Sequence, residues 1–209
     1  MDYDEKVIID PSYCDEDREV RSKEVTEIWN IVASSQHLIR VTSLFLEALD
    51  LFKEALSCYQ NGTYMAAAAM CGSALESAIY RVSIATNLRA CREHICSYRT
   101  DERAKIACRN FRKCLEIAKL KRYIDNKLKS RIEKIRRFRN FAIHYSQRLE
   151  RELTKLMTVV LTRRREEDTT SKSLQTISWI LRKKARRLLK KTAEILIHIA
   201  ENVTKALPT

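Results

Sequence analysis

Apolar residues recur every three or four positions along residues 24–60, which is the spacing of one face of an α-helix. The positions that share this face are Val25, Ile28, Val32, Ile39, Leu46, Leu49 and Leu56. The pair Ser34-Ser35 interrupts the pattern and predicts a kink. Asn61-Gly62 predicts the end of the helix, because glycine readily adopts the left-handed conformation that follows many helices.

A second helix is predicted from Tyr64 to about Asn87, with Thr63 placed to cap its first turn. The stretch from Met65 to Ala74 reads Met-Ala-Ala-Ala-Ala-Met-Cys-Gly-Ser-Ala and consists mostly of small residues. Small side chains allow a neighbouring helix to approach closely. We therefore expect this helix to be the most buried element.

Three more helices are predicted in the rest of the chain. One runs from Thr100 to about Tyr123, one begins at Lys127, and the last runs from Ser173 to about Ala206. A polar stretch at residues 163–171 separates the last two. The buried stripe expected on the helix that begins at Lys127 consists of Leu128, Ile132, Ile135, Ala142, Leu149, Leu153, Leu156 and Val160.

The chain of 209 residues contains only two glycines and two prolines. A sheet protein of this length needs more of both residues in its turns, so we expect an all-α protein. Residues 1–22 are acidic and lack helical periodicity, which predicts a tail. Residues 23–62 are then a long N-terminal helical extension packed on a helical body formed by residues 63–209.

The formal net charge is +13, and it is unevenly distributed. Residues 1–20 carry eight acids and two bases, a net charge of −6, which leaves +19 on the remaining residues. Such an excess of cations favours a polyanionic partner, although a solvated surface of mixed charge is the alternative. Six basic residues have the spacing of one side of the last helix: Arg182, Lys183, Arg186, Arg187, Lys190 and Lys191. They are candidates for phosphate contacts along an RNA backbone, and a solvated helix face is again the alternative.

No apolar run approaches the ~18 residues of a membrane span, and the acidic N-terminus does not have the order of a signal peptide. We therefore expect a cytoplasmic protein that makes no membrane contact. The seven cysteines are an odd number and fit reduced, mostly buried thiols. Cys91, His94 and Cys96, with Cys108 or Cys114, have the donor types of a zinc site, but the paired Cys-x-x-Cys spacing is missing. A short loop with buried thiols is the simpler interpretation, and we expect no metal and no cofactor.

Candidate chemistry is concentrated in one segment, Ile135-Arg136-Arg137-Phe138-Arg139-Asn140-Phe141-Ala142-Ile143-His144-Tyr145. A histidine transfers protons near neutral pH, and guanidinium groups bind phosphate with paired donors, so this combination suits chemistry on a phosphodiester. The spacing alone is weak evidence, because Arg89 and His94 share it. The distinguishing features are Asn140 directly after Arg139 and the regular apolar pattern around them.

This segment resembles the HEPN superfamily of all-α domains, whose nucleases carry an arginine, a polar residue and a histidine a few positions later. The small-residue helix from Tyr64 to Glu76, with Ala74-Leu75-Glu76, is similar to the helix that opens many of these domains. The stretch from Leu120 to Leu128 is similar to their approach to the motif. The resemblance covers roughly residues 63–206.

The resemblance implies a metal-independent endoribonuclease that works as a homodimer with a composite site. In that site His144 moves protons at the ribose 2′-hydroxyl or the leaving 5′-oxygen, Arg139 stabilises charge on the phosphate, and Asn140 orients His144. Apart from the resemblance, Arg136 and Arg137 lie on the same side of the helix as Asn140 and His144 and are candidate phosphate ligands. A toxin–antitoxin or defence setting is also implied, with an antitoxin or a nucleotidyltransferase as a possible partner protein. The alternative is a non-catalytic module that binds nucleic acid, a nucleotide or a partner protein.

Helix geometry limits how Arg139 and His144 can act together. Five residues turn an ideal helix by about 500°, so the two side chains lie about 140° apart, whereas Asn140 and His144 share a face. Either Arg139 reaches around the helix, the helix is distorted, or two subunits each supply one group. A structural hydrogen-bond network at a helix crossing is the non-catalytic interpretation, and Glu76 is a candidate contact from the second helix.

Overall fold

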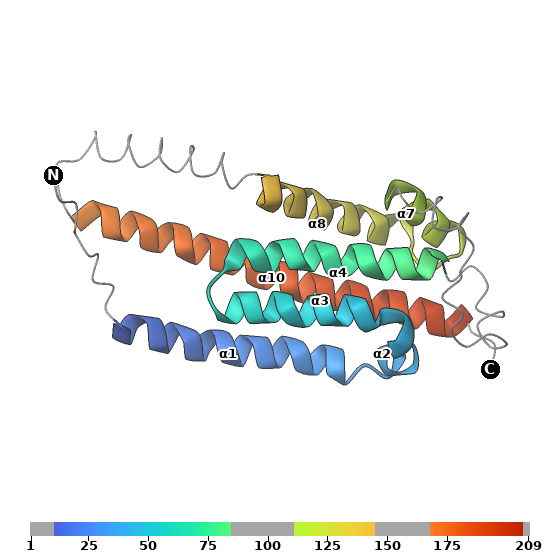
Figure 1. The fold of residues 1–209 in the computed structure, drawn as a ribbon, viewed down its shortest axis with the longest axis horizontal. Helices are drawn as coiled ribbons and strands as arrows, with labels where there is room; N and C mark the ends of the chain where they lie inside the picture. The colour runs from blue at the N-terminus through green and yellow to red at the C-terminus, as the bar shows by residue number, and fades with distance from the viewer. Residues whose placement is uncertain (1–10, 85–110, 145–167, 207–209) are drawn as a thin grey trace.

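The computed structural model describes residues 11–84, 111–144 and 168–206, and within these ranges every regular element is an α-helix. The expectation of an all-α protein is therefore confirmed for the described residues. The helices lie side by side in an elongated bundle, in which α1 (Pro11–Ala33), α4 (Tyr64–Ile84) and α10 (Asp168–Ala206) run in one direction (Figure 1). The helices α3 (Thr42–Gln60) and α8 (Asn126–His144) run in the opposite direction. None of the described helices combines the length and apolar content of a membrane span.

The single bent helix predicted for residues 24–60 is instead three helices, because the short α2 (Gln36–Arg40) separates α1 from α3. Ser35 caps α2, and its hydroxyl accepts a hydrogen bond from the Leu38 amide at 3.4 Å. The two breaks rotate the apolar face, so the expected core residues Ile39 and Leu46 are exposed. The buried residues of α3 are Phe45, Ala48, Phe52, Ala55, Leu56 and Tyr59.

The prediction of a tail over residues 1–22 is wrong for residues 11–22, which belong to α1. Proline is well suited to the first position of a helix because its missing N–H has no helical partner there, and α1 begins at Pro11. Arg21 then fastens this part of α1 to the bundle, since its Nε donates to the carbonyl oxygen of Gln60 at 2.9 Å. Residues 1–10 lie outside the described residues.

The turn between α3 and α4 follows the sequence prediction in its main feature. Gly62 adopts a left-handed φ of 78°, and the two helices pack antiparallel on either side of it. The hydroxyl of Thr63, which was expected to cap α4, donates to the carbonyl oxygen of Cys58 at 2.7 Å. The Thr63 hydroxyl therefore forms its hydrogen bond with the last turn of α3 and not with the first turn of α4.

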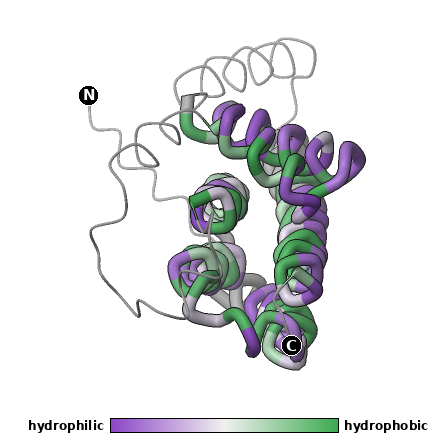
Figure 2. Tube along the Cα trace, turned by 90° about the vertical axis from the view of Figure 1, so that its right-hand side faces the viewer, coloured by the Kyte–Doolittle hydropathy of each residue, from purple (hydrophilic) through white to green (hydrophobic). Residues whose placement is uncertain are grey.

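The helix α4 occupies the centre of the bundle, where it packs against α3, α8, α10 and α7 (Phe111–Leu120). Eleven of its 21 residues are buried, more than in any other helix of the described part, which confirms the sequence prediction. Figure 2 looks along the bundle and shows hydrophobic and hydrophilic residues on different parts of each helical turn. One continuous core joins residues from all the described helices, so it extends across the expected boundary at residues 62 and 63.

The helix α8 is positioned by a cap and a short apolar stripe. The carboxylate of Asp125 accepts a hydrogen bond from the Leu128 amide at 2.6 Å, as expected of an N-cap. Leu128, Ile132 and Ile135 are buried, whereas Ala142 is only partly buried. The predicted stripe positions from Leu149 onward lie outside the described residues, as does the part of the third predicted helix before Phe111.

Candidate nucleic-acid interface

The arginines before and inside the motif share one carboxylate from α4. The Nε atom of Arg136 lies 3.1 Å from Glu76 Oε1, and an Nη1 atom of Arg139 lies 3.1 Å from Glu76 Oε2. Glu76 is only 24% exposed, so the pairs are partly screened from water. Arg136 also covers the ring of Phe111, with its guanidinium carbon 4.9 Å from the ring centroid. The contact between Glu76 and the motif, raised from the sequence, is therefore present at the crossing of α4 and α8.

The stem of Arg139 packs against the backbone of α4 at Gly72. A Cβ atom built on this glycine would lie 2.5 Å from the Cβ and 2.8 Å from the Cγ of Arg139. Only a residue without a side chain fits at this distance, because carbon atoms in contact lie about 3.5–4.0 Å apart. The Nε atom of Arg139 is buried and makes no hydrogen bond to the described residues.

The rest of the motif continues along α8 toward its end. Arg137 is exposed, Asn140 is partly exposed, and His144 is the last residue of α8. The helix remains α-helical from Asn126 to His144, so a distortion does not bring Arg139 and His144 onto one face. The side chain of His144 lies outside the described residues, as do residues 145–167.

The six basic residues predicted to share one side of α10 fall into two groups. Four of them are exposed and point into solvent: Lys183, Arg187, Lys190 and Lys191. We call these four the basic face of α10. Together with Arg186 and Glu194 they line a shallow depression of about 360 Å³. Glu194 is itself paired with Arg131 of α8 at 2.6 Å, so a cation from α8 balances its charge at the edge of the depression.

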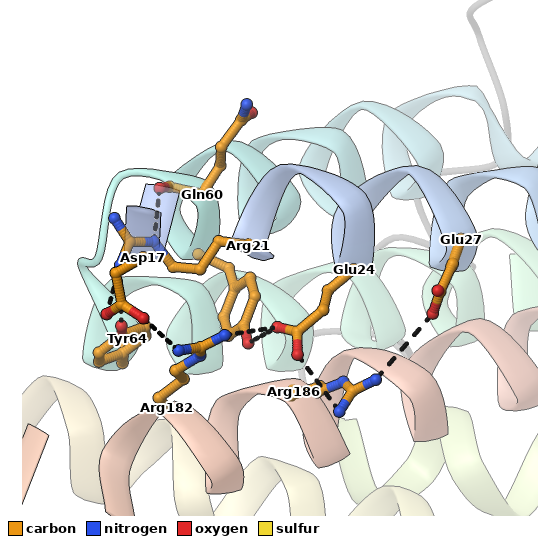
Figure 3. A network of polar contacts seen from close by, with 9 residues as sticks. Asp17, Arg21, Glu24, Glu27, Gln60, Tyr64, Arg182 and Arg186 are labelled. Atoms are coloured by element: carbon orange, nitrogen blue, oxygen red, sulfur yellow. Dashed lines mark hydrogen bonds and ion pairs between the residues drawn. The ribbon is translucent and has the colours of Figure 1, made fainter. Parts of the chain in front are cut away.

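The second group, Arg182 and Arg186, is covered by acidic residues of α1 (Figure 3). Arg182 donates to Asp17, and Glu24 lies 3.5 Å from Arg182 and 3.2 Å from Arg186. Glu27 lies 4.0 Å from Arg186. Carboxylates of α1 balance the charge of Arg186 in this structure, and its assignment as an RNA ligand stays a prediction.

A buried tyrosine completes the contact between α1 and α10. The hydroxyl of Tyr59 on α3 donates to Glu24, which is 12% exposed. Burial, together with the hydrogen bond to Glu24, raises the pKa of the Tyr59 phenol, so the phenol keeps its proton. Glu24 thus accepts a hydrogen bond from a phenol and forms ion pairs with two guanidinium groups. We call this arrangement of Asp17, Glu24, Glu27, Tyr59, Arg182 and Arg186 the α1/α10 network.

An exposed tryptophan next to the basic face was not predicted from the sequence. Trp179 is 59% exposed, and the Nζ atom of Lys183 lies 4.8 Å from the centroid of its ring. The two residues are four positions apart, and this spacing places side chains next to each other on a helix. The i, i+4 relationship was the available signal, but the sequence did not show that α10 leaves this part of its surface uncovered.

The described residues contain no group of three or more His, Cys, Asp or Glu side chains placed to hold a metal ion. Of the five residues considered for zinc, only Cys114 is described, and it is buried in the core. Cys91, His94, Cys96 and Cys108 lie outside the described residues.

Comparison of this chain with protein-family models, with curated proteins and with solved structures finds no match.

Proposed function

We propose that this chain binds RNA through its phosphate backbone, with the basic face of α10 as the contact surface. One observation carries the proposal: four cations lie together on one exposed side of one helix. Among the described residues, no carboxylate forms an ion pair with any of these four. In contrast, Arg182 and Arg186 on the same helix are compensated by α1.

A row of uncompensated cations gains free energy from polyanions because phosphate contacts release the counterions condensed on the nucleic acid. The strongly positive charge of the chain as a whole adds attraction at longer range. The choice of RNA as the polyanion rests on the resemblance of the motif segment to HEPN domains. Phosphate contacts of this kind position a nucleic acid without selecting its sequence.

The test compares two variants with the same loss of charge. In the first, glutamine replaces the four cations of the basic face. In the second, glutamine replaces four exposed cations on α2, α7 and α8, namely Arg40, Lys113, Lys119 and Lys127. We expect the first variant to lose at least tenfold in affinity for an RNA oligomer at low salt and the second to change by much less. Equal losses in both variants would show that net charge, rather than this face, determines binding.

A metal-independent endoribonuclease is the second candidate function, and one observation favours it. Glu76 fixes two guanidinium groups on the turns of α8 that lead to Asn140 and His144, and the Nε donor of Arg139 has no partner among the described residues. In this function His144 takes the proton of the 2′-hydroxyl as its oxygen attacks phosphorus. The 5′-oxygen leaves with a proton, and the products are a 2′,3′-cyclic phosphate and a 5′-hydroxyl. Arg139 and Asn140 stabilise and orient the reacting groups.

For this second function we propose that Arg139 and His144 of one composite site come from different subunits of a homodimer, because a regular helix separates the two side chains by about 140°. A protein partner, such as an antitoxin or a nucleotidyltransferase, belongs to the same proposal. The test is incubation of the purified protein with RNA in excess chelator, followed by analysis of fragment ends. Cleavage that disappears in Arg139→Ala and His144→Ala supports it, whereas no cleavage, or cleavage unaffected by either substitution, rejects it.

A further inference from the structure

We infer that the basic face of α10 takes a single-stranded segment of nucleic acid, and that Trp179 stacks on one of its bases. The inference rests on the proposed function, since it assigns a substrate class to the same surface. The inference adds Trp179 to the proposed contact surface, a residue that belongs neither to the motif segment nor to the basic face.

The first support is the exposure of Trp179. Tryptophan is a large apolar side chain, and 59% of its surface is in contact with solvent at the start of the basic face. The next residue along α10, Ile180, is also 39% exposed. An indole beside lysines and arginines has the composition of surfaces that bind single strands, in which aromatic rings stack on bases and cations contact phosphates.

The second support is the position of Lys183. Its Nζ atom lies 4.8 Å from the centroid of the Trp179 ring, within the distance of a cation–π contact. This contact limits the orientations of the indole. The ammonium lies over one face of the ring, so the opposite face is the one that takes the stacked base, and the positive charge lies close to that base's phosphate.

The third support is the order of the residues along α10. Helical rotation places Trp179, Lys183, Arg187 and Lys190 within about 80° of one another around the axis. From Trp179 to Lys190 the helix rises about 17 Å, enough for about five phosphates at the 3.4 Å spacing of one stacked strand. One strand can therefore place a base on Trp179 and its following phosphates along the basic face.

A duplex cannot place a base on Trp179 while its phosphates contact the basic face. Its internal bases already stack on both sides, so their faces are unavailable to an indole on the convex surface of a helix. A duplex can use only the cations, and its affinity depends on phosphate contacts alone. The distinction between single strand and duplex thus depends on Trp179.

The other tryptophan of the chain, Trp29, offers a comparison with Trp179. This tryptophan also lies under a lysine, with the Nζ atom of Lys53 5.2 Å from its ring centroid. Trp29 packs partly against the core, however, and Lys53 lies 3.9 Å from Asp50 on α3. The two tryptophans share the lysine contact but differ in whether a row of free cations adjoins them.

The experiment uses the full chain with Trp29→Phe, which leaves Trp179 as the only tryptophan. Three probes of equal length are titrated at low salt: a uridine 12-mer, an abasic ribose-phosphate 12-mer and an RNA duplex. We expect the uridine strand to quench the Trp179 fluorescence and to bind roughly 5- to 100-fold more tightly than the abasic strand, the range expected for stacking of one base. The Trp179→Ala and Trp179→Phe variants have no tryptophan left, so their affinities are measured by the fluorescence anisotropy of end-labelled probes. In Trp179→Ala the preference is lost and the abasic affinity is unchanged, while Trp179→Phe keeps part of the preference.

Other outcomes have separate meanings. Equal binding of the uridine and abasic strands, or equal losses for both in Trp179→Ala, overturns the inference and leaves the proposed function standing. Failure of all three probes to bind at low salt overturns the proposed function itself. A change in sedimentation mass in Trp179→Ala without a change in the uridine preference would assign Trp179 to contact with a second copy, and this too overturns the inference.

Discussion

Gly72 of α4 lies directly against the side chain of Arg139 on α8, and a Cβ atom on this glycine would lie 2.5 Å from the Cβ of Arg139. The arginine of the candidate motif is therefore also a packing residue at the crossing of two helices. Loss of activity in an Arg139 variant would not by itself distinguish catalysis from stability.

Replacement of Gly72 by alanine should destabilise the fold. The atom nearest to the added methyl group is the Cβ of Arg139, which cannot move away by side-chain rotation, so the backbone of α8 must shift. Such overpacking costs about 1–3 kcal/mol. The contact of 2.5 Å is severe enough to place the cost in the upper part of this range, above the roughly 1 kcal/mol that alanine gains over glycine in helix propensity. Urea unfolding of Gly72→Ala should show the loss, and Ser73→Ala, one position along, should remain within about 0.5 kcal/mol of the parent. An unchanged or raised stability in Gly72→Ala would contradict the packing described.

Replacement of Glu76 by glutamine should lower the free energy of unfolding by roughly 1–2 kcal/mol, after a discount for the solvent that reaches both arginines. The substitution leaves Arg136 and Arg139 next to each other without a shared carboxylate. A double-mutant cycle with Arg139→Gln should give a coupling energy of roughly 0.5–1 kcal/mol. The matched control is Glu47→Gln, which breaks the more exposed pair with Arg81 and should cost less. Strict additivity in the Glu76 cycle would show that the pair does not stabilise the crossing.

The α1/α10 network should link stability to RNA binding. Glu24→Gln removes the carboxylate shared by Tyr59, Arg182 and Arg186, which should cost roughly 1–3 kcal/mol of stability. The same change removes one of the two carboxylates that lie against each of Arg182 and Arg186, so RNA affinity at low salt should rise. Glu19→Gln, on an exposed part of the same helix, loses the same charge and serves as the control. If both variants gain affinity equally, the change in net charge explains the gain, and the carboxylates of α1 do not limit RNA binding at Arg182 and Arg186.

Stability should decline at alkaline pH because of a buried thiol. Burial raises the pKa of Cys71 to about 12, from 9.0 for an exposed thiol. Above about pH 9 the unfolded chain therefore releases a proton that the folded chain retains, so stability falls by up to about 1.4 kcal/mol per pH unit until the folded pKa is reached. Between pH 8 and 10 this amounts to about 1.4 kcal/mol. Urea midpoints should fall less over this range in Cys71→Ala, and an identical decline would assign the effect to other groups.

The helical class and the core of the fold could be predicted from the sequence because they depend on local patterns. The small residues of α4 identify the central helix, and Gly62 identifies the turn before it. The break between α1 and α2 lies at the predicted kink, Ser34-Ser35, but the second break, at Val41 between α2 and α3, could not be predicted because it is short and the apolar spacing continues through it. Ile39 and Leu46 were assigned to the core for this reason.

The candidate site depends on contacts between distant segments, and for that reason it was predicted less well. Arg182 and Arg187 look equivalent in the sequence, but only the first faces the carboxylates of α1. Asp17, which was predicted to lie in a tail, accepts a hydrogen bond from Arg182 of α10. Trp179 was overlooked since its exposure depends on how α10 is packed.

The central claim, that the basic face of α10 binds RNA phosphates, is tested most directly by the salt dependence of affinity. The affinity for a single-stranded RNA is measured between about 50 and 200 mM salt for the parent chain, for the glutamine variant of the basic face and for the matched variant on α2, α7 and α8. Each phosphate contact contributes about 0.7 to the slope of log affinity against log salt for a single strand. We predict that the basic-face variant loses about three units of slope and the matched variant less than one. Equal slopes for the parent and the basic-face variant would contradict the claim.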